Sequence, residues 1–86
     1  MDSEKVARLG RLGRDAMRAR IALADASADL ACAKFALANL TEETDDIGFF
    51  FEEEVFICES LLLAAEDAQR LASSEFRAAW DARYAS

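Results

Sequence analysis

The strongest constraint on the fold is a heptad repeat of leucine and alanine in the first half of the chain. Ten consecutive a and d positions hold no other residue type: Leu9, Leu12, Ala16, Ala19, Leu23, Ala26, Leu30, Ala33, Leu37 and Leu40. An unbroken repeat of this kind is typical of a long helix that packs along another helix. Because alanine is frequent in this row, we expect the two helix backbones to approach closely.

The second half contains segments that resemble strands, because Phe49–Phe51 and Val55–Ile57 have high β propensity. The polar residues nevertheless follow two heptad-spaced stripes, which are Asp45, Glu52, Glu59, Glu66, Ser73 and Asp46, Glu53, Ser60, Asp67, Ser74, Asp81. A strand would spread these residues over both faces, whereas a helix stacks them on one solvent-facing side. Opposite them lies a predicted seam of Phe51, Val55, Cys58, Leu62, Ala65, Gln69, Ala72, Phe76 and Ala79. The pattern therefore predicts a second helix.

The chain has no proline and only three glycines, which favours an all-α fold. We expect a single helical domain over residues 1–86, with a first helix at about 3–40, an acidic turn at about 41–44 and a second helix at about 44–84. Asn39 is the expected stop of the first helix, through a left-handed conformation. Thr41 is the expected cap of the second, with Thr44, Asp45 and Asp46 as alternatives.

Both predicted helices carry more apolar surface than a two-helix hairpin can cover. Helix 1 has a second row of Met17, Ile21, Ala24, Ala28, Ala31, Phe35 and Ala38. Helix 2 has a second row of Phe50, Ile57, Leu61, Ala64, Ala68, Leu71 and Ala78, and a third of Phe49, Phe56 and Leu63. Since a helix must bury its apolar face against another element, these rows need a partner. The favoured arrangement is a homodimer that forms an antiparallel four-helix bundle. The alternatives are a different protein that covers the rows, or a self-sufficient three-helix fold.

The charge is segregated along the chain. The net charge is −7, but residues 1–20 hold six basic and three acidic groups. Eight carboxylates without a lysine or arginine occupy the region from Thr41 to Glu59: Glu42, Glu43, Asp45, Asp46, Glu52, Glu53, Glu54 and Glu59. Such a surface can imitate a row of phosphates and bind a basic cleft, for example on a nucleic-acid-handling protein. The alternative explanation is that these carboxylates only keep an apolar helix soluble. The composition resembles that of small acidic inhibitors carried by phages, including some anti-CRISPR proteins, although no motif links the chain to a family.

A basic face on the first helix offers a different function. Arg8, Arg11, Arg14 and Arg18 recur at helical spacing, so most of them share one side. They could track phosphates in a nucleic-acid-binding four-helix bundle. The negative total charge, the acidic residues on the same side and the lack of neighbouring aromatic residues for base stacking count against this.

The remaining residues offer little chemistry. Without histidine and without Cys-x-x-Cys spacing, neither a metal site nor a cofactor is expected, and no nucleophile has a recognisable base. A hairpin that turns near Thr41 would place Cys32 opposite residue 50, too far from Cys58 for a disulfide. Free thiols favour a cytoplasmic location. No signal peptide or membrane span is expected.

The sequence therefore predicts a non-enzymatic protein-binding module, an acidic adaptor or inhibitor that binds a basic surface on another macromolecule. Nucleic-acid binding through the arginines is one alternative. A chaperone-like or secretion-accessory subunit that covers a partner's helix is another.

Overall fold

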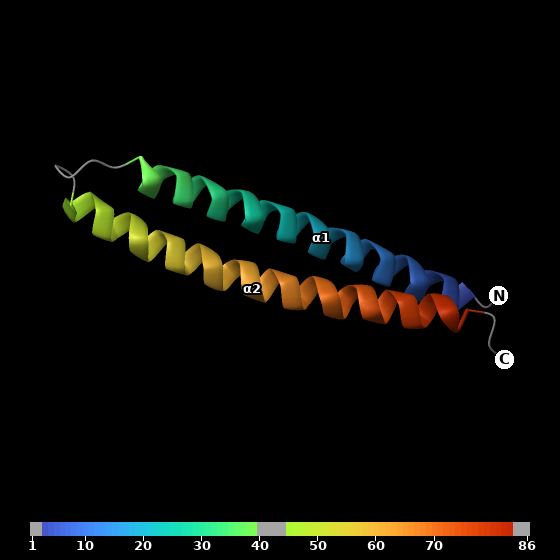
Figure 1. Ribbon diagram of the computed structural model, residues 1–86. Coiled ribbons are helices and arrows are strands. Elements are labelled where there is room, and N and C mark those ends of the chain that lie inside the picture. Colours follow the sequence, from blue (N-terminus) through green and yellow to red (C-terminus); the bar gives the residue numbers. More distant parts are fainter. Residues whose placement is uncertain (1–2, 40–44, 84–86) are drawn as a thin grey trace.

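The computed structural model describes residues 3–39 and 45–83, without the side chains of 45–51, and shows two long helices. Helix α1 spans Ser3–Ala38 and helix α2 spans Asp45–Asp81. They pack side by side in opposite directions as a hairpin, so that the start of α1 lies beside the end of α2 (Figure 1). The rod that results measures 67 × 13 × 13 Å. The predicted all-α hairpin is confirmed, and the three-helix alternative is wrong because the described residues form two helices.

The heptad seam is the contact between the helices. Every described seam position on α1, from Leu9 to Leu37, is buried or half-buried, and so is every seam position on α2 from Val55 to Ala79. The residues around Val55 that have high β propensity are helical. The seam prediction is confirmed because helical periodicity, not local propensity, determines which side chains can be buried together. Leu40 lies outside the described residues, as does the side chain of Phe51.

The register of the hairpin differs from the expectation. A turn near Thr41 would place residue 69 opposite Gly13, but the ring of Phe76, one heptad farther along α2, lies there. Leu30 and Ala33 correspondingly cluster with Cys58. A shift of one heptad returns every a and d position to the seam, so the seam pattern alone cannot fix the register. Where the chain turns decides it, and α2 begins at Asp45.

The described helix ends use side-chain hydrogen bonds. α1 ends at Ala38, and Asn39 does not adopt the expected left-handed conformation, since no described non-glycine residue has a positive φ. The side-chain amide of Asn39 instead donates to the carbonyl oxygen of Phe35 over 2.7 Å. At the end of α2, Nη1 of Arg83 donates to the carbonyl oxygen of Trp80 over 2.6 Å. Each carbonyl oxygen also accepts the backbone N–H of the same residue over 3.2 Å, so each side chain adds a second hydrogen bond at its helix end. The predicted cap at Thr41, and its alternative Thr44, lie outside the described residues.

The interior of the hairpin is thin. Among the described residues only Leu30, Ala33 and Cys58 are buried, and no large side chain is fully enclosed. The radius of gyration is 19.3 Å, against about 12 Å for a compact chain of this length. The accessible surface is 6623 Å², whereas a compact monomer of this mass exposes roughly 5,000 Å². The hairpin therefore leaves unburied a large surface that an ordinary domain would cover.

Candidate protein-binding surfaces

The second apolar rows predicted for both helices are exposed. On α1, Phe35 keeps 73% of its surface accessible, and Met17 and Ile21 are also exposed. On α2, Phe56 of the third row is 69% exposed. The side chains of Phe49 and Phe50 lie outside the described residues. Because few monomers leave many large apolar side chains in water, these rows indicate a partner or an oligomer.

One of these rows extends along most of the described length of α2. It consists of Ile57, Leu61, Ala64, Ala68, Leu71 and Ala78, all of them exposed, and we call it the α2 apolar strip. Its members follow one another at intervals of three, four or seven residues, so they share one side of the helix. Leu63 and Phe56 are exposed as well, but acidic residues separate them from the strip on one side and from the seam on the other. The strip is therefore the longest apolar row exposed on the described part of α2, and the exposed Glu75 interrupts it between Leu71 and Ala78.

The predicted acidic surface is partly described. Glu52, Glu53, Glu54 and Glu59 are all exposed on α2. Asp45 and Asp46 belong to α2, but their side chains lie outside the described residues, and so do Glu42 and Glu43 altogether. No lysine or arginine occurs on α2 between Asp45 and Gln69, so α2 itself supplies no cation to these carboxylates.

The predicted basic face is exposed and is joined by residues from the other helix. Arg8, Arg11, Arg14 and Arg18 are all exposed on α1, and Arg18 lies 3.9 Å from Asp15 in an exposed pair within the helix. The hairpin brings the last turns of α2, which carry Arg77 and Arg83, to this same end (Figure 1). The molecule consequently has a basic end, where the first turns of α1 lie beside the last turns of α2, and an acidic half toward the turn.

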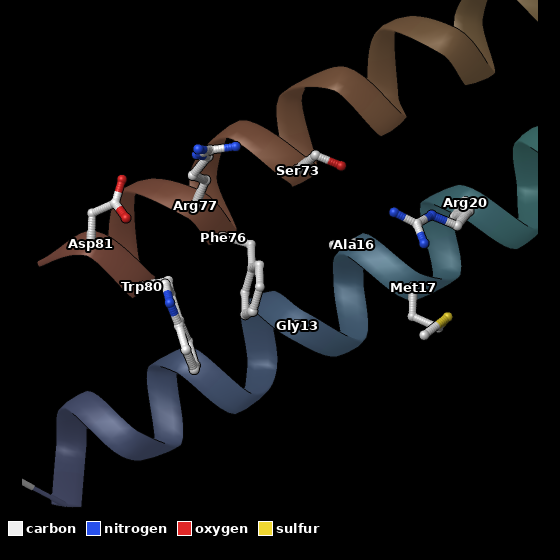
Figure 2. A pocket seen from close by; sticks show the side chains of 9 residues that line it. All are labelled: Gly13, Ala16, Met17, Arg20, Ser73, Phe76, Arg77, Trp80 and Asp81. Carbon is white, nitrogen blue, oxygen red and sulfur yellow. The ribbon is translucent and has the colours of Figure 1, made fainter. Parts of the chain in front are cut away.

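A groove lies between the helices at the basic end, with a volume of about 730 Å³. It is lined by Gly13, Ala16, Met17, Arg20, Ser73, Phe76, Arg77, Trp80 and Asp81. Figure 2 shows Phe76 and Trp80 reaching from α2 toward α1, with the Phe76 ring beside Gly13. The two rings are 6.2 Å apart, and the guanidinium of Arg83 lies 3.8 Å from the centre of the Trp80 ring. This stacking is a cation–π contact.

The groove is the feature that sequence reasoning missed. Trp80 follows Ser73 at the next heptad position of the predicted polar stripe and is its one apolar member. This irregularity is the feature of the sequence that could have indicated a site at this end of α2. The arginines beside an aromatic ring are Arg83, which stacks on Trp80, and the groove residues Arg20 and Arg77, none of which belongs to the predicted basic face. Trp80 is far from Arg14 in sequence, and only the antiparallel packing brings the last turns of α2 beside the first turns of α1.

The two cysteines are free and lie in different environments. Cys32 is exposed, whereas Cys58 is buried in the seam. Burial raises the pKa of the Cys58 thiol, and the carboxylates of Glu54 and Asp29 raise it further. The predicted reason for the lack of a disulfide was wrong, because the observed register places Cys32 nearly level with Cys58. They stay apart because Cys58 faces the seam and Cys32 faces solvent.

Within the described part of the chain, no three histidine, cysteine or acidic side chains gather as a metal site would require. Neither described helix contains a stretch that is apolar enough to cross a bilayer.

Comparison with known proteins found no match to a family model, to a curated protein or to a solved structure.

Proposed function

We propose that this chain is a non-catalytic protein-binding module that works as a homodimer, in which two hairpins form a four-helix bundle. Its acidic half binds a basic surface on another macromolecule, of the kind found on nucleic-acid-handling proteins. The observation that carries the proposal is the combination of exposed apolar rows with a separate row of exposed carboxylates on a stretch of α2 that has no lysine or arginine.

The apolar surface supports self-association. The hairpin exposes roughly 1,600 Å² more than a compact monomer of its mass would. A specific interface of standard size buries about 800 Å² on each partner, so the excess is more than enough for one dimer interface. A dimer also requires no further component, since each copy supplies the same surface to the other.

The carboxylates support the second contact. Glu52, Glu53 and Glu59 belong to the two polar stripes, which are separate from the α2 apolar strip. They therefore stay accessible when the strip is covered. Charges at the rim of an interface mainly accelerate association and select the partner, which suits an adaptor or an inhibitor.

The test is the capture of a partner from the cell that produces the chain, followed by direct binding measurements with the captured protein. The double variant Glu52→Lys/Glu53→Lys should lose capture, and the binding of the unaltered chain should weaken steeply with salt. Asp67→Lys/Asp81→Lys is the matched control, because it changes the net charge equally, lies outside both the acidic surface and the α2 apolar strip, and should retain capture. Equal binding by both variants would reject the acidic surface as the site.

A second candidate function is supported by the basic end. Arg77 and Arg83 of α2 lie at the same end as the α1 arginines, beside an aromatic ring that is 46% exposed, Trp80. Arginines next to an aromatic ring are typical of surfaces that bind single-stranded nucleic acid. A gel shift with single-stranded RNA or DNA at low salt, abolished by Arg11→Glu/Arg14→Glu, would favour this function. The absence of a shift would dismiss it.

A further inference from the structure

The hairpin has two broad sides that differ in character. One side carries the groove, to which Arg20 and Trp80 contribute. The groove residues Ser73 and Arg77 lie on one flank of the α2 seam, and by helical periodicity the α2 apolar strip lies on the other flank. By the same periodicity a row of exposed α1 residues that includes Cys32 lies beside the strip. The carboxylates of Asp29 and Glu54, which act on the thiol of Cys58, mark this second side on both helices.

The charges of α1 on this second side are ordered along the rod. Arg8, Arg11 and Arg18 lie toward the basic end, with Asp15 among them, whereas Asp25 and Asp29 lie toward the turn. All of these residues are exposed and follow one another at helical intervals of three, four or seven residues. The row therefore changes from mainly positive to negative along its length, and such a row is complementary to a reversed copy of itself.

We propose that a second copy of this chain packs on the α2 apolar strip in the opposite direction, with the basic end of each hairpin over the acidic half of the other. The proposal rests on the homodimer of the proposed function and adds the face and the orientation. A two-fold interface uses the same patch on both subunits, so the patch must be complementary to itself. The reversed arrangement meets this requirement, since it places Arg18 of one copy close to Asp25 of the other.

The opposite orientation is electrostatically unfavourable. With both turns at the same end, Asp25, Asp29 and Glu54 of one copy would all lie level with their equivalents in the second copy. Like charges brought together at an interface destabilise it and suppress that arrangement. On the groove side Glu59, Glu66 and Arg77 interrupt the apolar residues of α2, while the α1 row that includes Met17, which lines the groove, stays exposed in this dimer.

Cys32 reports on the orientation without any substitution. It is exposed, whereas Cys58 is buried and its raised pKa makes it a poor nucleophile, so a nitroxide label at neutral pH should attach to Cys32 alone. The observed register places the middle of the α2 apolar strip level with Ala22. At a rise of about 1.5 Å per residue, Cys32 is then roughly 15 Å from the centre of the dimer. The reversed dimer separates the two labels by about 30 Å, twice that offset, whereas the other orientation brings them within roughly 20 Å across the bundle.

The face is tested by two leucines of α2 that are equally exposed. Leu61 lies in the α2 apolar strip and is 59% exposed, while Leu63 lies on the groove side and is 62% exposed. Leu61→Glu should raise the dissociation constant of the dimer at least tenfold, measured by sedimentation. Leu63→Glu should leave it within about twofold. Circular dichroism shows whether each variant keeps its helices.

Each outcome decides a separate point. A pulsed electron paramagnetic resonance distance near 30 Å, together with selective dissociation of Leu61→Glu, establishes the proposed dimer. A distance within roughly 20 Å overturns the orientation, and dissociation by Leu63→Glu alone overturns the face. If the unaltered chain sediments as a monomer at high concentration, the homodimer of the proposed function fails as well, whereas partner capture by the acidic surface is measured independently.

Discussion

Two glycines on α1 offer a matched test of how closely the two helices pack. Gly10 and Gly13 lie one turn apart, and both are half-buried. A Cβ atom added at Gly10 would meet only Nη1 of Arg14 at 3.6 Å, which is ordinary van der Waals contact. A Cβ atom added at Gly13 would meet Cε2 of Phe76 at 3.2 Å, with two more ring atoms within 3.9 Å. Alanine therefore fits at Gly10 without rearrangement, whereas at Gly13 it crowds the Phe76 ring.

The expected magnitudes follow from these distances. Alanine stabilises a helix interior over glycine by about 1 kcal/mol, so Gly10→Ala should raise the melting temperature by roughly 4–8 °C. Gly13→Ala has the same gain in helix propensity, but the Phe76 ring must shift by a few tenths of an ångström. Overpacking of this kind costs about 1 kcal/mol or more. We expect Gly13→Ala to raise the melting temperature by less than half as much as Gly10→Ala.

Thermal denaturation followed by circular dichroism, at one fixed protein concentration, measures both variants. The control repeats Gly13→Ala in a Phe76→Leu background, where the crowding is relieved and the full gain should return. Equal gains for the two alanine variants in the natural background would refute the close approach of Phe76 to α1, and with it the observed register.

Three further predictions concern the seam. Iodoacetamide at pH 7.5 should alkylate Cys32 much faster than Cys58, as mass spectrometry of the folded protein will show; equal rates would contradict the burial of Cys58. Because the pKa of Cys58 is raised, its contribution to stability is complete below the ordinary thiol pKa of about 8.5 and is lost as the pH rises through the raised value. The difference in melting temperature between the natural chain and Cys58→Ala should therefore shrink between pH 8 and 10.5, and a constant difference would argue against the shift. Gln69, whose Nε2 donates to Oγ of Ser73 over 2.9 Å, occupies a partly buried seam position. Gln69→Leu should raise the free energy of unfolding by about 1 kcal/mol in urea titrations, because it replaces a buried amide by an apolar side chain; destabilisation would show that the hydrogen bond outweighs the burial.

The helices and the seam could be predicted because their signal is repeated many times. Each heptad independently places an apolar residue at the same angle around the helix. The heptad-spaced polar stripes therefore predict a helix even where a segment such as Phe49–Phe51 has high β propensity. The exposed rows were predicted for the same reason. Their occupant was not, because a helix face shows that it needs cover without showing what covers it.

The register and the groove could not be predicted, because each depends on one local event. Phe76 lies beside Gly13, and a heptad repeat is satisfied equally well when the helices are shifted by seven residues, so it has no information on that choice. The groove follows from the register, since it unites the first turns of one helix with the last turns of the other. The conformation at Asn39 is also local, since its side chain and its backbone N–H both donate to the last turn of α1.

Each described helix of this hairpin packs against one other helix, and this has a consequence for how the hairpin folds. Far more chain separates Gly13 from Phe76 than separates Ala33 from Val55, so contacts near the turn close the shortest loops. Pairing of the two helices should start near the turn and extend stepwise toward the end that carries Trp80. Within the described residues of a single hairpin no third element packs against that end, so its last turns can separate while the middle stays paired. The groove is then the part of a single hairpin that opens at the lowest cost.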